Sequence, residues 1–579
     1  MSSSISLSIP LPNVPAVGVK GSDVFSSSGD PRLDLSVKCV RGADASVLSA
    51  ALDGVLALKT QQGLEDAFVL AFHARNIRGG KGEKAIFQTL YSRLCETQPI
   101  VAKALLDLVP HYGCWNDLLV LAENAQKLAS LNVTSQHLSI SLGIVDFYAK
   151  TLCDESKLEK PPTLAAKWAP REGSKHNSLA KQIANVLFPL QLVTKHSAQM
   201  RHYRRLVADL NAKLNTVETL MCSDRWDTIV PGSVPGRAGK LYSKAFLNLP
   251  STHRAKGVPK PSGEYRCPDS EKRMICRRKF EAHFAAAAAG KAKVHGADTL
   301  FPHEVVQQAS ETHGLTSAEK DQLNAVWLGM VEKTKAAGGL GKSIFMSDFS
   351  GSMSGTPYWV SMALGILGSC VCADEFKDKL MTFDSNPTWH HFEAGSDLFA
   401  RIQTIKGSGI GQGLSTDFQK AMDLVLETLK AKRMRPGQEP ENLIVLTDMG
   451  WDAACSSSET SGYTGNSYRH VVKTAGWQTH LAMIAEAFKR AGEDMWGPGQ
   501  GFTVPRIVIW NLRAGVTDFH ATADTPGVVM LSGWSPTQFE ILQKEGPRQM
   551  TAYEMLRLEL DDPKYLRVRE RIRAVIGNL

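Results

Sequence analysis

Apolar side chains recur at three- and four-residue steps through the first half of the chain. Val47, Leu48, Ala51, Val55 and Leu58 have this spacing, which gives a helix one buried face. Further helices are expected over 85–96, 100–109, 178–188, 195–221, 271–288 and 315–336, with another starting near residue 115. Successive helices joined by short breaks indicate a helix-pair solenoid. We therefore expect a helical domain over 46–336, preceded by an extended arm over 1–45.

The pattern changes after a glycine-rich linker at 338–341. Short apolar runs, expected to be strands, cover 343–347, 380–383, 443–447, 506–510 and 528–531; helices are expected over 359–373, 418–430 and 479–491, and two more close the chain. Strands that alternate with helices predict a doubly wound, mainly parallel sheet in a domain over 342–579. Ligands of such sheets bind at the carboxyl ends of the strands, where Asp348 and Asp448 lie.

Charge is distributed unevenly between these two regions. Residues 151–300 carry 26 Lys and Arg against 13 Asp and Glu, whereas residues 336–579 carry 24 against 27. A basic segment joined to a nearly neutral domain favours a polyanionic partner such as RNA for the first region. An ordinary solvated surface is the alternative.

The candidate RNA-binding residues fall in three groups. The first surrounds the glycines of the loop at 79–82, where a backbone can approach phosphate, the second flanks Tyr203, and the third lies on one predicted helix. They are Arg75, Arg78, Lys81 and Lys84; Arg201, Arg204 and Arg205; and Lys272, Arg273, Arg277 and Arg278. The alternative for the first group is a solvated turn between helices.

Several classes of protein are disfavoured. Residues 1–15 lack the basic start and apolar centre of a secretory signal, so the ten cysteines are expected to stay reduced in a cytoplasmic protein and to serve as small core side chains. No stretch approaches 18 apolar residues, which argues against a membrane span. Neither a Gly-x-Ser-x-Gly nucleophile pattern nor a phosphate-binding P-loop occurs, so we expect a binding protein rather than an enzyme.

The most specific chemistry is a set of oxygen-bearing side chains spread over a hundred residues. Asp348, Ser350 and Ser352 follow one predicted strand, Asp448 follows another, and Thr416 lies between them. Hard cations prefer oxygen ligands in octahedral geometry, so the set predicts Mg²⁺ or Mn²⁺. Three alternatives remain open: Asp417 rather than Thr416 as the ligand, a site without metal, and an ordinary polar loop.

This pattern resembles the metal-ion-dependent adhesion site (MIDAS) of von Willebrand factor A domains. The resemblance implies that Ser350, Ser352 and Thr416 ligate the ion directly, while Asp348 and Asp448 hold it directly or through water. It also implies a Rossmann-like fold and a coordination position left for a partner's carboxylate. The loop before Thr416 reads Gly-Leu-Ser-Thr over 413–416 and has no pair of adjacent glycines, so it departs from the expected loop pattern.

The helical half carries a second resemblance. The segments at 73–83 and 112–118 are similar to the TROVE module of Ro ribonucleoproteins, in which HEAT-like helices hold RNA and a von Willebrand A domain follows. Segments at 167–171, 203–206, 416–419, 447–452 and 510–512 resemble more closely an uncharacterised two-part family of plants, fungi, large DNA viruses and bacteria. Together the resemblances cover about residues 20–575.

These observations favour an RNA-binding, Ro-like ribonucleoprotein component with a divalent-metal site. The second hypothesis is a protein-interaction scaffold whose metal captures a partner's carboxylate, without nucleic acid. A third is a structural or assembly protein.

Overall fold

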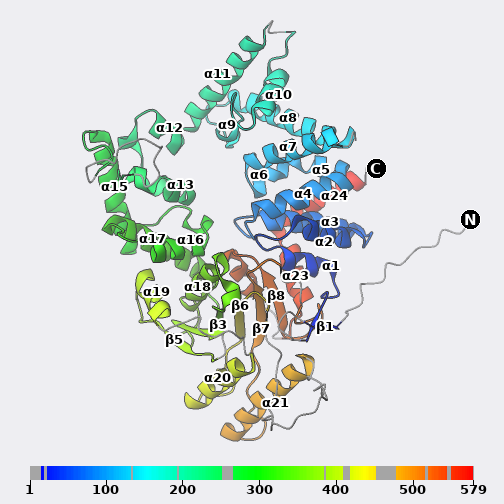
Figure 1. Ribbon diagram of the computed structural model, residues 1–579, viewed down its shortest axis with the longest axis vertical. Helices are drawn as coiled ribbons and strands as arrows, with labels where there is room; N and C mark the ends of the chain where they lie inside the picture. Colours follow the sequence, from blue (N-terminus) through cyan, green and yellow to red (C-terminus); the bar gives the residue numbers. More distant parts are fainter. Residues whose placement is uncertain are drawn as a thin grey trace, which may run out of the picture. The chain divides into compact units, whose positions relative to one another are not determined.

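The computed structural model describes residues 15–17, 23–131, 135–191, 195–250, 265–383, 386–407, 418–450, 477–515, 519–543 and 549–577 (Figure 1). The chain divides into two compact units. Unit 1 comprises Met1–Ala67, Phe301–His313 and Met330–Asp562, and unit 2 comprises Phe68–Leu300, Gly314–Gly329 and Pro563–Leu579. The coarse class, a helical N-terminal region followed by an α/β sheet region, agrees with the prediction.

The boundaries of the units differ from the predicted domains. The N-terminal 67 residues join the sheet unit, and the last helix joins the helical unit. Periodicity identifies the type of an element but not its packing partner, which explains the difference.

Unit 1 contains the sheet. Its elements are β1 (Pro15–Val17), β2 (Asp23–Phe25), α1 (Pro31–Lys38), α2 (Ala45–Leu56), α16 (Pro302–Glu311), β3 (Ser343–Asp348), η5 (Gly351–Met353), α18 (Thr356–Ser369), β4 (Lys379–Phe383), β5 (Trp389–His391), α19 (Leu398–Gly407), α20 (Phe418–Ala431), β6 (Asn442–Thr447), α21 (Trp477–Trp496), β7 (Arg506–Asn511), β8 (Val528–Ser532), η6 (Pro536–Gln538), α22 (Phe539–Gln543) and α23 (Ala552–Leu560).

Six of the described strands form one sheet in the order β5-β4-β3-β6-β7-β8. All neighbours in it are parallel except β4 and β5. Strands β3, β6, β7 and β8 are buried along their whole length, as expected for a parallel sheet covered on both faces. The three-residue antiparallel strand β5 was not predicted, because so short a run carries no periodic signal.

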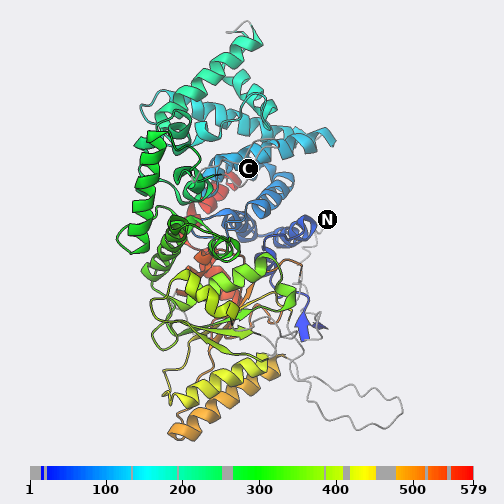
Figure 2. The same ribbon diagram turned by 60° about the vertical axis from the view of Figure 1, so that its left-hand side comes forward.

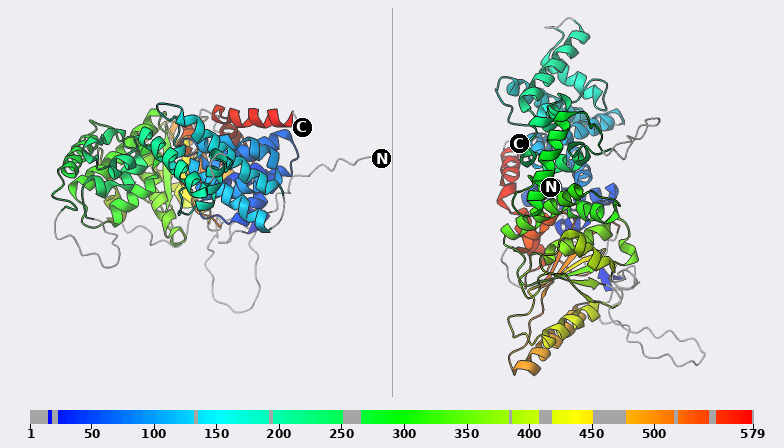
Figure 3. Two further views of the ribbon diagram at one scale, coloured as in Figure 1. Left: turned by 90° about the horizontal axis from the view of Figure 1, so that it is seen from above. Right: turned by 90° about the vertical axis from the view of Figure 1, so that its left-hand side faces the viewer.

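The strand order reverses between β3 and β6. The chain passes from β3 through α18 to its neighbour β4, and later returns to the other side of β3 as β6. Right-handed crossovers in opposite directions place helices on opposite faces. Accordingly, α18 lies on one side of the sheet, and α20 and α21 lie on the other (Figures 2 and 3). Such a reversal opens a crevice at the carboxyl ends of the two strands.

Two glycines let α18 approach β3 closely. A Cβ at Gly368 would lie 2.1 Å from the ring of Phe345, and one at Gly365 would lie 2.4 Å from Ser347 Oγ. Helix α18 therefore packs directly against β3, the strand that ends at Asp348.

The N-terminal segment is not wholly extended, which corrects the prediction for 1–45. Helix α1 begins after Asp30, whose carboxylate accepts hydrogen bonds from the backbone N–H groups of Arg32 and Leu33, and Pro31 occupies the first turn. The helix packs against β8 and α23. The sequence pattern missed it because eight residues make barely two turns.

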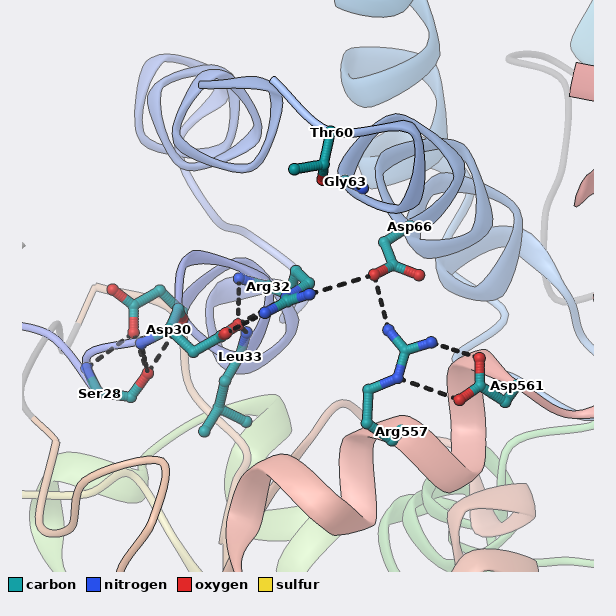
Figure 4. Close-up of polar contacts among 10 residues, drawn as sticks. Ser28, Asp30, Arg32, Leu33, Thr60, Gly63, Asp66, Arg557 and Asp561 are labelled. Atoms are coloured by element: carbon teal, nitrogen blue, oxygen red, sulfur yellow. Dashed lines mark hydrogen bonds and ion pairs between the residues drawn. The ribbon is translucent and has the colours of Figure 1, made fainter. Parts of the chain in front are cut away.

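A buried carboxylate links α1, α3 and α23 within unit 1 (Figure 4). Asp66, which is fully buried, accepts hydrogen bonds from Arg557 at 2.6 Å and from Arg32 at 3.5 Å. Arg32 also pairs with Asp30, and Arg557 with Asp561. Each arginine thus has a second acidic partner nearer the surface, and Asp66 provides the shared buried one.

Unit 2 is helical. Its elements are α3 (Gln61–Arg75), α4 (Lys84–Thr97), α5 (Pro99–Ala104), η1 (Leu106–Leu108), α6 (Val109–Tyr112), α7 (Trp115–Leu131), α8 (Ser135–Ser156), α9 (Ala165–Trp168), α10 (Asn177–Leu187), α11 (His196–Leu214), α12 (Val217–Cys222), η2 (Trp226–Thr228), η3 (Pro231–Ser233), α13 (Gly236–Leu241), α14 (Ser243–Phe246), α15 (Glu271–Ala288), η4 (Ala297–Thr299), α17 (Ser317–Ala336), η7 (Pro563–Tyr565) and α24 (Leu566–Ile576), with the division between units falling inside α3 and α17.

Neighbouring helices of unit 2 pack in sequence: α4 on α7, α7 on α8, α8 on α10 and α10 on α11. The predicted helix 195–221 is interrupted at Asn215, which ends α11 in the left-handed conformation with a φ of 48°. Within the described residues, no helix combines the length and apolar character needed to cross a membrane.

Candidate metal centre

Strand β3 ends at Asp348, which is fully buried. One carboxylate oxygen accepts the backbone N–H of Ser350 at 2.8 Å, and the other accepts the hydroxyl of Thr447 at 3.1 Å. An aspartate that accepts an N–H two residues on turns the chain sharply at the end of a strand. The carboxylate is therefore fixed by both strands at the reversal of the sheet.

The turn after β3 brings two hydroxyls together. Ser350 Oγ lies 3.0 Å from Ser352 Oγ, and the short helix η5 (Gly351–Met353) spans the residues between and after them. Ser350 is buried, at 3% exposed, and Ser352 is partly buried. Three of the predicted ligand side chains thus share one turn.

Asp448 reaches the same edge from β6. Ser347 pairs with Leu446 in the parallel register, so Asp348 and Asp448 both lie just past the last paired rows of neighbouring strands. Asp448 is 3% exposed, and its carboxylate accepts the N–H of Gly450 at 3.0 Å. The structure therefore brings Asp348, Ser350, Ser352 and Asp448 together at the strand reversal.

Asp348 and Asp448 are two buried carboxylates that lie close enough to interact electrostatically. Burial and, to a smaller extent, the negative charge of Asp448 together raise the pKa of Asp348 from 3.8 to about 6. Among the described residues, no lysine, arginine or histidine forms an ion pair with either carboxylate. Buried charges are ordinarily paired or bound to metal. Two carboxylates beside two hydroxyls fit a hard divalent cation in charge and donor type.

Hydroxyl donors are essential to this fit. The part of the chain that the structure describes contains no group of three or more His, Cys, Asp and Glu side chains that could hold a metal. Thr416, the fifth predicted ligand, and its rival Asp417 lie outside the described residues. Their part in the site stays a prediction.

Sequence reasoning missed two residues at this edge. Thr447 donates its hydroxyl to Asp348 and accepts the N–H of Met449 at 3.2 Å. His520 donates through Nε2 to the Met449 carbonyl at 2.7 Å. The first could have been noticed beside Asp448, but no sequence signal links a histidine 72 positions later to this turn.

The glycine loop of unit 2 is packed rather than open. Arg75 is buried and pairs with the fully buried Asp117 at 2.7 Å, and Lys81 is 1% exposed. A Cβ at Gly80 would lie 2.2 Å from the His73 carbonyl, so this glycine serves close backbone packing. The prediction for Arg75 and Lys81 therefore needs correction, because buried side chains cannot reach a ligand on the surface.

The remaining predicted cations lie nearer the surface, and most have partners. Arg204 pairs with Glu172, Arg205 with Asp209, Lys272 with Asp224, Arg277 with Glu281 and Lys84 with Asp117; Arg273 lies over the ring of Trp226. Arg78, Arg201 and Arg278 are exposed and form no ion pair with any described residue. Among the predicted RNA-binding cations, these three are the most available to a polyanion.

Two comparisons with known proteins give a match. Residues 342–565 match a family model described as "Domain of unknown function (DUF7788)". Over 531 residues the chain is 25% identical to "Uncharacterized protein L728" of Acanthamoeba polyphaga mimivirus, an alignment that covers 89% of this chain and 82% of that protein. No solved structure matches the chain significantly. The family model includes both carboxylates of the candidate site, but neither description names an activity.

Proposed function

We propose that unit 1 is a von Willebrand A-like domain that binds a divalent cation, Mg²⁺ or Mn²⁺, at a MIDAS-type site. The observation that carries the proposal is the convergence of Asp348 and Asp448, buried and without a cationic partner among described residues, with the hydroxyls of Ser350 and Ser352. Thr416 is the proposed fifth ligand. The strand reversal where these residues meet is the usual ligand position of a doubly wound sheet.

In this proposal each group has one role. The hydroxyls of Ser350 and Ser352 face the ion, and the two carboxylates balance its charge directly or through bound water. Thr447 holds the Asp348 carboxylate in place by its hydroxyl. The ion would leave one coordination position for a carboxylate of a partner, so the function is binding rather than catalysis.

Isothermal titration calorimetry of the full chain with MgCl₂ tests the proposal. Ser352→Ala removes a proposed ligand, and Ser354→Ala removes an exposed hydroxyl two residues further along the same turn. We expect saturable binding by the wild type and by Ser354→Ala, and at least a ten-fold weaker affinity for Ser352→Ala. Equal affinity for the two variants would place any bound ion elsewhere.

We further propose that the protein is a cytoplasmic, Ro-like RNA-binding protein, and that unit 2, its HEAT-like helical unit, binds the RNA. Support comes from the basic segment 151–300 and from the exposed, unpaired Arg78, Arg201 and Arg278 within the described residues. Cations without acidic partners can neutralise phosphates without first breaking an ion pair.

A filter-binding titration with single-stranded RNA at rising salt tests this second proposal. Arg201→Glu combined with Arg278→Glu should weaken binding and reduce its salt dependence. Lys127→Glu, at another exposed position in unit 2, is the control and should change affinity little. If RNA does not bind even at about 50 mM salt, the metal-dependent scaffold becomes the better hypothesis, and Asp348→Ala should then abolish capture of a protein partner.

A further inference from the structure

The turn after β6 adopts an unfavourable backbone conformation. Met449 has a φ of 64°, in the left-handed region that side chains other than glycine rarely occupy. It stands between Asp448 and Gly450, and its conformation sets the direction of the Gly450 N–H, which donates to the Asp448 carboxylate at 3.0 Å. A conformation of this kind persists only where surrounding contacts hold it.

Both the backbone N–H and the backbone carbonyl of Met449 form hydrogen bonds to side chains. Its N–H donates to Thr447 Oγ1 at 3.2 Å, and its carbonyl accepts from His520 Nε2 at 2.7 Å. His520 is 1% exposed. Because its partner is a carbonyl, the histidine must carry its hydrogen on Nε2, and it acts as a donor.

The N-terminal segment holds the chain around His520. Phe25 and Phe519 exchange both backbone hydrogen bonds, at 2.8 and 2.9 Å, and the N–H of Ala523 donates to the Ser28 carbonyl at 2.8 Å. These contacts lie one residue before and three residues after His520. Ser28 in turn donates its N–H to Asp34 of α1 at 2.8 Å.

We propose that His520 is a positioning residue of the cation site. It fixes Met449 in the left-handed conformation that directs the Gly450 N–H to the Asp448 carboxylate, and residues 23–28 of the N-terminal segment fix His520. The inference rests on the proposed cation binding. It adds that the affinity for the cation depends on an N-terminal segment more than 300 residues from the first ligand in sequence.

Variants of His520 in the full chain test the proposal by calorimetry with MgCl₂. His520→Leu removes the donor, and His520→Gln offers an amide N–H in its place. His303→Leu is the matched control, since His303 is also buried in unit 1, against Trp534. Loss of a group that orients metal ligands weakens affinity by about 10–100-fold. We expect about ten-fold for His520→Leu, partial or full recovery for His520→Gln, and wild-type affinity for His303→Leu.

Hydrogen exchange with EDTA present tests the same turn without metal. His520→Leu should speed exchange at the amides of 447–450, whereas His303→Leu should not. Phe25→Pro, which removes the N–H that bonds to Phe519, should speed exchange at 519–523 and weaken Mg²⁺ binding; Phe25→Ala keeps that N–H and should do neither.

The outcomes separate the two proposals. If the wild type binds no Mg²⁺, the proposed function fails, and the exchange data still decide whether His520 holds the turn. If the wild type binds Mg²⁺ and His520→Leu binds it equally well, or exchange at 447–450 is unchanged, the positioning role is overturned. The role is also overturned if His303→Leu weakens binding as much as His520→Leu, because the loss then reflects general destabilisation.

Discussion

Removing the charge of Asp348 should stabilise the metal-free protein while destroying the proposed cation site. The pKa of Asp348 is raised from 3.8 to about 6, first by burial and then by the charge of Asp448. The folded state therefore holds the proton more tightly than the unfolded chain. This contribution to stability is fully present below about pH 4 and is lost as the pH rises through about 6.

The size of the effect follows from the two pKa values. They differ by about 2 pH units, and each unit corresponds to about 1.4 kcal/mol, so ionised Asp348 costs about 3 kcal/mol at pH 8. Asp348→Asn keeps an oxygen that can accept the Ser350 N–H but carries no charge. Without metal it should be more stable than the wild type by up to about 3 kcal/mol at pH 8, with a smaller advantage at pH 5.

Urea unfolding with EDTA at pH 5 and pH 8 measures this difference. Asp66→Asn is the control, because Asp66 is also fully buried but is paired with two arginines, so its loss should destabilise the protein at both pH values. The reasoning is refuted if Asp348→Asn is less stable than the wild type at pH 8, or if its advantage is the same at both pH values.

Three further predictions test the packing. Asp66→Asn should lower the free energy of unfolding by about 2 kcal/mol, measured by urea denaturation, because both arginines lose their shared buried acceptor. Gly80→Ala should lower the melting temperature, since a Cβ there would meet the backbone of α3 at 2.2 Å, whereas Gly239→Ala in α13 meets nothing within 4 Å and should not. Iodoacetamide at pH 8 should label the exposed Cys153 and leave Cys370 unlabelled, because burial raises the pKa of Cys370 to about 11; mass spectrometry of the labelled peptides decides.

The spacing of hydrophobic residues predicted most of the helices and strands, but it did not predict how the chain divides into two units. The helix expected over 271–288 has the same bounds in the structure, and the strand expected over 506–510 extends by one residue. By contrast, α24 packs on α5 of unit 2, and α1 packs on β8 of unit 1. These contacts join residues hundreds of positions apart. The spacing of hydrophobic residues shows which face of an element is buried, but not which other element packs against that face.

The candidate site could be predicted because its side chains follow strands. Asp348 and Asp448 each end a buried apolar run, and parallel strands place such ends at one edge of a sheet. His520 could not be predicted, since it acts through a backbone carbonyl. Arg75 was misjudged because a cation beside glycines suits phosphate binding and buried ion pairing equally well, and only the packing against Asp117 distinguishes the two.

Crystals of the full chain grown with Mn²⁺ test the central claim most directly. Anomalous scattering distinguishes the manganese ion from water and from lighter ions. We predict one strong peak at the strand reversal, about 2 Å from the hydroxyl oxygens of Ser350 and Ser352 and adjacent to the carboxylates of Asp348 and Asp448. A fully occupied ion elsewhere on unit 1, or no peak at this edge despite saturating Mn²⁺, would contradict the account.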